Sequence, residues 1–161
     1  MRGHAHNVRQ FMKLSEVLQP DNVHLQVPVT TKAALLGYLA QTVADAQGLA
    51  KDDILNALQS REDLGSTGIG SGIAIPHASV SGLGDPYMLL IRTSKPVEFD
   101  SIDEQPVDLI CLILTPAGEQ NHYLTLLAKA ARQLGSSDIV QKIRNAGTPL
   151  EMHTAITTCD R

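Results

Sequence analysis

The stretch PVDLICLIL, residues 106–114, is apolar throughout except for Asp108. A strand with one face in water alternates apolar and polar residues, whereas an unbroken apolar run is typical of a strand whose sheet is buried on both faces. Cys111 lies within this run, and we expect it to be a small buried hydrophobic residue. The run therefore predicts a strand of a sheet that lies between helices.

Helical and strand-like segments alternate on both sides of this run. The stretch 30–48 has apolar residues at helical spacing, with Thr30 or Thr31 as candidate N-cap and Gly48 as terminator. Because no repeat and no Ser/Pro-rich linker interrupts the alternation, the sequence predicts one α/β domain, a sandwich with a mixed β-sheet flanked by helices. The strand order does not follow from the pattern. Further helices are predicted over 13–18, 50–62, 121–135, 136–147 and 148–157, and further strands over 23–27, 72–77 and 87–93.

The composition excludes several classes of function. The 161 residues carry a formal net charge of -4, and only 3% are aromatic, with no Trp. A large cationic surface or a base-stacking platform for nucleic acid is therefore not expected. No stretch approaches the roughly 18 apolar residues of a membrane span, and no signal peptide is visible. We expect a cytoplasmic domain without membrane insertion.

A disulfide framework and a zinc ribbon have no support in the sequence, and metal binding by the pair His4 and His6 is a less favoured alternative to a solvated tail. Cys111 and Cys159 are far apart, and neither has a CxxC partner. We interpret residues 1–11 as an extended start or a segment added for expression, in which His4 and His6 belong to a solvated tail. The domain is expected to span residues 12–161, with neither a metal nor an organic cofactor.

Most of the candidate chemistry lies in SREDLGSTGIGSGIAIPHASV, residues 60–80. Glycines let backbone N–H groups approach an anion closely. The segment is not a Walker A loop, because no Gly-Lys-Ser/Thr follows, and it is not a dinucleotide fingerprint, because Ile73 occupies the last position of GxGxxG. It is not GxSxG either, because Ser71 lies directly between two glycines. On composition alone, a glycine turn that leads into a strand is favoured over a phosphate-binding loop.

His77 gives this segment a reactive side chain. It follows Pro76, which favours an extended Ile75 and so fixes the direction of the chain. Imidazole is mostly neutral and nucleophilic at pH 7, so a histidine beside an arginine could accept a phosphoryl group and pass it on. The transition state of such a transfer is loose, and catalysis is mainly positioning and charge stabilisation. Arg61 would supply a bidentate ligand for the phosphoryl oxygens.

A second histidine, His122, lies at the predicted start of the 121–135 helix. The positive end of a helix disfavours imidazolium, and its free N–H groups favour an anion nearby. Each histidine taken alone is more often a structural or surface residue than a catalytic one. We keep that interpretation for His24 and His153.

The block SREDLGSTGIGSGIAIPHA, residues 60–78, resembles the signature of the fructose/mannitol-type enzyme IIA domains of the bacterial phosphoenolpyruvate-dependent phosphotransferase system. The resemblance continues through PVEFDSIDEQPVDLICLILTPAGEQNHYLTLLAKAARQL and runs from about residue 13 to residue 157. The combination of Arg-Glu-x-x-Gly-Ser-Thr, Gly-Ile-Gly, Ile-Pro-His and His-x-Leu-x-x-Leu-Ala is highly specific, although each piece alone is weak.

The resemblance implies a two-layered α/β sandwich and assigns roles by position. His77 matches the phosphorylated histidine, Arg61 the arginine before the glycine loop, and His122 the second active-site histidine. The chain looks most like the free-standing nitrogen-related branch, whose members receive phosphate from an HPr-like carrier and bind regulatory targets according to phosphorylation state. Two departures concern the branch: Glu104 stands where a glycine is expected after Asp103, and PHASV, residues 76–80, replaces a more common continuation.

From this resemblance we expect a component of a phosphotransferase system that turns over no small molecule by itself. Backbone N–H groups around Ser66, Thr67 and Gly68 are expected to add donors to the phosphoryl group. One alternative is a sugar-specific enzyme IIA that passes phosphate to an enzyme IIB. Another is an interaction module that has lost phosphotransfer. A histidine-dependent hydrolase has little support, because no triad-like nucleophile lies near His77 in the sequence.

Overall fold

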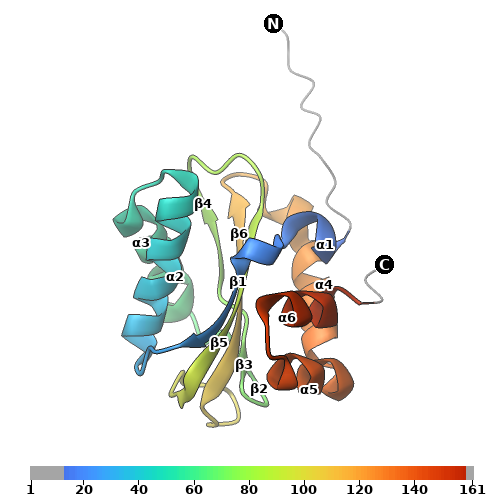
Figure 1. Cartoon of the computed structure of the whole chain (residues 1–161). Coiled ribbons are helices and arrows are strands. Elements are labelled where there is room, and N and C mark those ends of the chain that lie inside the picture. Colours follow the sequence, from blue (N-terminus) through green and yellow to red (C-terminus); the bar gives the residue numbers. More distant parts are fainter. Residues whose placement is uncertain (1–12, 159–161) are drawn as a thin grey trace, which may run out of the picture.

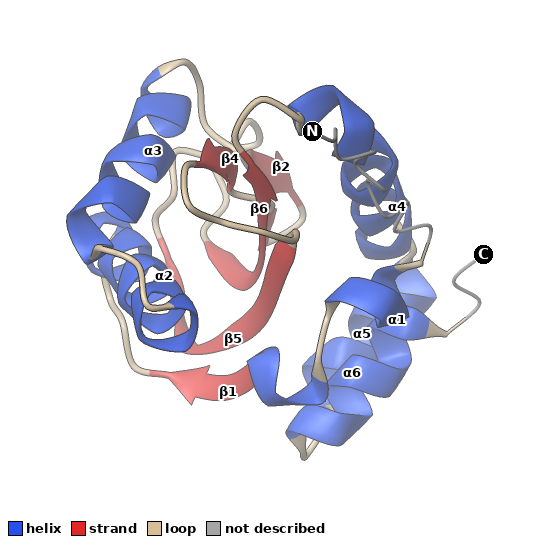
Figure 2. Ribbon diagram, turned by 90° about the horizontal axis from the view of Figure 1, so that it is seen from above, coloured by secondary structure: helices blue, strands red, loops and turns tan. Residues whose placement is uncertain are grey.

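The structure is a computed structural model that describes residues 13–158, without the side chains of Gln120 and His122. Two layers of helices enclose one mixed β-sheet (Figures 1 and 2). Helices α2 and α3 cover one face of the sheet, and α1, α4, α5 and α6 lie on the other (Figure 1). The predicted single-domain α/β sandwich is confirmed. It has three layers rather than the two that the resemblance implies, because helices cover both faces of the sheet (Figure 1). The interpretation of residues 1–11 and the unpaired Cys159 lie outside the described residues.

All the predicted helices form, and α2 begins and ends at its predicted caps. Thr31 accepts a hydrogen bond from the Ala34 amide at 3.1 Å, and Gly48 ends its helix in the left-handed conformation at φ 66°. Among residues 13–158, no helix is both long enough and apolar enough to cross a membrane. The α-helices are α1 Leu14–Val17, α2 Lys32–Gln47, α3 Lys51–Asp63, α4 Leu124–Leu134, α5 Ser137–Asn145 and α6 Pro149–Thr157, and the 3-10 turns are η1 Pro20–Asn22 and η2 Gln120–Tyr123.

The sheet is organised around β6, the strand that contains the apolar run. Its order is β1-β5-β6-β3-β2, and β4 also pairs with β6. Strand β5 is antiparallel to β6, whereas β3 and β4 run parallel to it. The strands are β1 Val23–Val27, β2 Gly68–Gly70, β3 Ile73–Ala74, β4 His77–Val80, β5 Tyr87–Val97 and β6 Val107–Pro116.

Strand β6 is buried on both faces, as its sequence predicts. Leu109, Cys111 and Ile113 belong to the hydrophobic cluster that includes α4, α5 and α6, whereas Ile110 and Leu112 belong to the cluster that includes α2 and α3. Successive side chains of a strand point to opposite faces, so one continuous apolar run supplies two separate cores.

The predicted strand over 72–77 is divided into two. Strands β3 and β4 both pair with β6, in the registers Ile73↔Leu109 and His77↔Ile113, but Ile75 and Pro76 between them lie outside both strands. Proline has no N–H to donate to a ladder, so the strand is interrupted there. His77 is therefore the first residue of a new strand.

Two further boundaries differ from the sequence prediction. The 121–135 helix begins as the 3-10 turn η2, and α4 itself starts only at Leu124. In the glycine-rich segment, Gly68–Gly70 is a short strand that turns back through Ser71 into β3. The glycine turn leading into a strand therefore describes residues 70–73. At Gly68 the reason for glycine is space, because a Cβ there would collide with Ser101.

Glu104 is a non-glycine residue with a positive φ, so it offers a test of local backbone strain. Glu104 has φ 59°, in the left-handed region that glycine adopts without steric strain. We predict that Glu104→Gly stabilises the fold by up to about 1 kcal/mol, measured as a higher urea midpoint. Glu98→Gly is the matched control, because Glu98 is also exposed but is not among the residues with positive φ. A loss of stability with Glu104→Gly would contradict the assignment of strain.

Cys111 provides a probe of the central strand. Its side chain is fully buried, and burial raises the pKa of its thiol to about 12. In a Cys159→Ser background, where Cys111 is the one remaining thiol, we predict that a disulfide reagent modifies the protein only when it unfolds. Modification of the folded protein as fast as of a free thiol would show that β6 is accessible.

Candidate functional site

The ring of His77 is oriented by the backbone just before it. Its Nδ1 atom lies 2.9 Å from the carbonyl oxygen of Ile75. A carbonyl oxygen only accepts hydrogen bonds, so Nδ1 carries the proton of the neutral ring. The lone pair is then on Nε2, which is the nitrogen able to attack an electrophile. The partial exposure of His77 leaves the ring accessible from the solvent.

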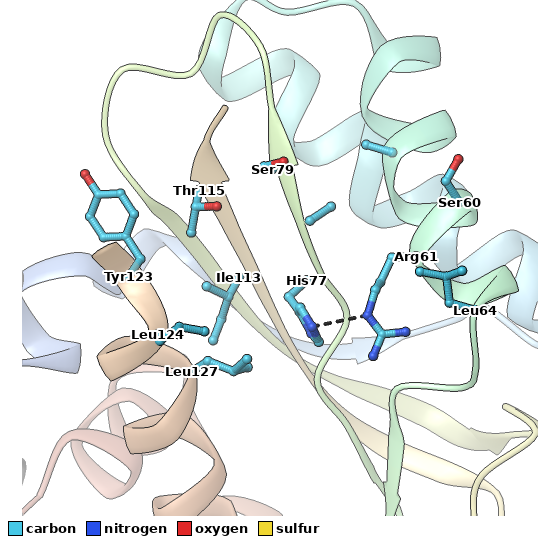
Figure 3. Close-up of a pocket in the computed structure, with 12 residues that line it drawn as sticks. Ser60, Arg61, Leu64, His77, Ser79, Ile113, Thr115, Tyr123, Leu124 and Leu127 are labelled. Carbon is cyan, nitrogen blue, oxygen red and sulfur yellow. Dashed lines mark hydrogen bonds between the residues drawn. The ribbon is translucent and has the colours of Figure 1, made fainter. Parts of the chain in front are cut away.

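Arg61 lies in the last turn of α3 and faces that nitrogen (Figure 3). Its Nε donates to His77 Nε2 at 3.3 Å, and its Nη1 donates to the Gly65 carbonyl oxygen at 2.9 Å. Because Nε can only donate, this contact requires the same tautomer of His77 as the Ile75 contact does. A guanidinium has five N–H groups, of which these contacts use two, so Arg61 retains donors for an anion beside Nε2.

The turn after α3 is fixed by a buried carboxylate. The Glu62 side chain is 2% exposed, and it pairs with Lys32 Nζ at 3.0 Å. It also accepts hydrogen bonds from the Thr67 hydroxyl and from the Thr67 amide, the latter at 3.2 Å. Neither Glu62 nor Lys32 is a residue that the sequence analysis selected. The helical pattern of the sequence does not show that these two residues form an ion pair, although Glu62 is the Glu of the Arg-Glu pair in the quoted block.

The three loop residues have partners inside the protein. The Gly68 amide donates to Ser66 Oγ at 3.0 Å, and Ser66 Oγ donates to the Phe99 carbonyl at 2.8 Å. The Thr67 amide donates to Glu62, as described above. The structure thus differs from the expectation that the Thr67 and Gly68 amides face a phosphoryl group, because both are engaged in holding the turn together.

Arg61 and His77 line a cleft of about 470 Å³. Its rim carries two exposed leucines that the sequence analysis did not single out, Leu64 at 84% and Leu124 at 56% exposure. Figure 3 shows α3 on one side of β4 and β6, and η2 with α4 on the other. The cleft therefore lies between α3 of one helical layer and α4 of the other, beside β4 and β6 (Figure 3). Its lining residues are Ala57, Ser60, Arg61, Leu64, His77, Ala78, Ser79, Ile113, Thr115, Tyr123, Leu124 and Leu127.

The predicted second histidine adjoins this cleft through its backbone. His122 belongs to η2, and the next two residues, Tyr123 and Leu124, line the cleft. The side chain of His122 lies outside what the structure describes. Burial raises the pKa of Tyr123, and the negative charges of Glu119 and Asp85 raise it further.

The other two described histidines have structural partners, as predicted. Nδ1 of His24 lies 2.6 Å from the Tyr38 hydroxyl, and Nε2 of His153 lies 2.7 Å from the Leu18 carbonyl. Both contacts lie outside the cleft residues.

The tautomers of two histidines provide a direct test of this geometry. We predict that the neutral ring of His77 is protonated on Nδ1 and that of His153 on Nε2, because each of these nitrogens faces a backbone carbonyl. Long-range ¹H–¹⁵N spectra distinguish the two tautomers, and His153 serves as the internal control. A His77 ring protonated on Nε2 would contradict the contact with Arg61.

The sequence is similar to that of nitrogen regulatory proteins. It is 35% identical over 133 residues to the nitrogen regulatory protein of Bradyrhizobium diazoefficiens, a match that covers 83% of this chain and 87% of the relative. The crystal structure of the nitrogen regulatory protein IIA-Ntr from Neisseria meningitidis superposes with a TM-score of 0.84 at 31% identity, covering 88% of this chain and 97% of that one.

A more distant likeness concerns the fold alone. The Escherichia coli mannitol enzyme IIA, in its complex with phosphorylated enzyme IIB, has a TM-score of 0.72 at 15% identity, with 86% of this chain and 96% of that chain covered.

The family model described as phosphoenolpyruvate-dependent sugar phosphotransferase system, EIIA 2, matches residues 16–159. The chain therefore belongs to the type-2 enzyme IIA family of the phosphotransferase system, and within it resembles the nitrogen regulatory members.

Proposed function

We propose that this protein is a phosphohistidine carrier, in which Nε2 of His77 accepts a phosphoryl group from a phosphohistidine of an HPr-like protein. The observation that carries the proposal is the ring orientation: Nε2 holds the lone pair and lies 3.3 Å from Arg61 Nε, inside an open cleft. Membership of the enzyme IIA family supports it.

In the proposed step, the Nε2 lone pair attacks phosphorus while the donor's N–P bond breaks and its electron pair returns to the donor imidazole. His77 keeps its Nδ1 proton, and the Ile75 carbonyl stabilises the positive charge that develops on the ring. Arg61 moves its Nε contact from the ring nitrogen to a phosphoryl oxygen. The contribution of these groups is positioning and charge stabilisation, which suits a loose transition state.

His122 is proposed as the second histidine of the site. The position of η2 beside the cleft supports this, because Tyr123 and Leu124 line the cleft directly after it. For Ser66, Thr67 and Gly68 the hydrogen bonds support an indirect role, in which these residues hold the turn that carries the Gly65 carbonyl. We place the domain at residues 12–161.

The output of the carrier is proposed to be regulatory. Phosphorylation adds about two negative charges at His77, in a cleft rimmed by exposed leucines, so one partner surface can be repelled and another recruited. Similarity to nitrogen regulatory proteins favours regulatory targets as partners. The alternative acceptor is an enzyme IIB, as in the mannitol complex. We propose that the protein works in the cytoplasm without a cofactor and turns over no small molecule by itself.

The test is intact-mass analysis after incubation with phosphoenolpyruvate and the general donor proteins of the system. We predict one acid-labile phosphoryl group on the wild type and none on His77→Ala. His122→Ala should still accept the group on His77, about 100- to 1,000-fold more slowly, because one group that stabilises the transition state is lost.

The negative result has a defined meaning if the donor protein is shown to be phosphorylated in the same mixture. An unmodified wild type would then leave an interaction module on an enzyme IIA scaffold. Rapid discharge of the phosphorylated protein by an enzyme IIB would favour the sugar-specific alternative over the regulatory one.

A further inference from the structure

The acidic side chain next to Arg61 has no part in the chemistry described so far. Glu62 points away from the cleft, into the protein, and its carboxylate is 2% exposed. It lies in the last turn of α3, where the negative end of the helix disfavours a carboxylate. Its partner Lys32 opens α2, where the positive end of that helix disfavours a cation.

Helix stability therefore does not account for this pair. Removing the Glu62 carboxylate from water has a large desolvation penalty, and buried ion pairs often add no net stability over apolar residues of similar size. The pair is held in place by other contacts: Lys32 Nζ lies 4.4 Å from the centre of the Phe99 ring and 3.6 Å from Asp100. These contacts fix the position of the carboxylate.

What Glu62 holds is the turn that leaves α3. The Gly65 amide donates to the Glu62 carbonyl at 3.0 Å, and the Thr67 amide and hydroxyl donate to the Glu62 carboxylate. The turn is thus bound to the same residue at two points. The Gly65 carbonyl lies between these points, and it is the acceptor for Arg61 Nη1 at 2.9 Å.

We propose that Glu62 is the positioning residue of the phosphoryl-accepting site. By fixing residues 65–67 it sets the direction of the Gly65 carbonyl, which holds Nη1 of Arg61 and so turns Nε toward His77 Nε2. An arginine on an unrestrained turn would sample many rotamers, and ordering it would add to the barrier of transfer. The expected effect of Glu62 on the transfer rate rests on the proposed function, whereas its effect on the orientation of Arg61 does not.

Three variants separate positioning from stability. Glu62→Gln removes the charge, and with it the ion pair to Lys32, at nearly constant shape, and Thr67→Val removes one hydrogen bond to the carboxylate. Val140→Ala is the matched control, because Val140 is buried in α5, away from the cleft residues, and its truncation lowers stability without touching the site.

The readouts are the rate of phosphoryl acceptance per folded molecule and the ¹⁵N signals of Arg61 Nε and His77 Nε2. We expect Glu62→Gln to slow acceptance about 10- to 100-fold, as a small misplacement of a catalytic group does. The His77 Nε2 signal should move toward that of Arg61→Ala, and the Arg61 Nε signal toward that of an arginine exposed to solvent. Thr67→Val should shift both readouts in the same direction, and Val140→Ala should change the unfolding midpoint only.

Two different failures can be told apart. A wild type that is never phosphorylated on His77 refutes the proposed function, while the NMR signals still report whether Glu62 orders Arg61. A folded Glu62→Gln protein with the wild-type rate and unchanged signals refutes the positioning role. If Glu62→Gln does not fold, Thr67→Val carries the same test, and unchanged readouts in that variant overturn the inference.

Discussion

The hydrogen bond between His77 Nδ1 and the Ile75 carbonyl is the constraint on which the site depends. It fixes the tautomer and turns Nε2 toward Arg61. The Ile75 carbonyl lies between the two strands, since β3 ends at Ala74 and β4 begins at His77. The backbone segment that separates β3 from β4 therefore also orients the ring.

The site combines both helical layers. Arg61 and Leu64 come from α3 and the turn after it, whereas Tyr123 and Leu124 come from η2 and α4. Strand β6 holds the layers together, since its alternate side chains belong to the two clusters. Formation of the cleft thus requires both cores, which links the site to the folding of the whole domain.

Much of the fold could be predicted because its signals are local. The apolar run of β6 indicates burial on both faces, and Thr31 and Gly48 mark the ends of α2. The division of the 72–77 strand at Pro76 was not predicted. The sequence argument from Pro76 concerned only the backbone of Ile75. The missing N–H interrupts a strand because this stretch pairs with β6, which is distant in the sequence.

The reactive residues of the candidate site could be predicted from the sequence, but the residues that hold them in position could not. His77 and Arg61 were selected from the sequence, and the structure brings them to 3.3 Å. The buried Glu62 was not selected, because a carboxylate in the last turn of a helix normally reads as a solvated residue. The exposure of Leu64 and Leu124 could not be predicted either, since periodicity does not show which apolar residues the tertiary fold leaves uncovered.

The most direct test of the proposed mechanism is to determine which nitrogen carries the phosphoryl group. The protein would be phosphorylated by its donor with ¹⁵N-labelled histidine, and ³¹P and ¹⁵N spectra would identify the bonded nitrogen. The account predicts a phosphoryl group on Nε2 of His77, with the proton retained on Nδ1. A phosphoryl group on Nδ1, or on a histidine other than His77, would contradict it.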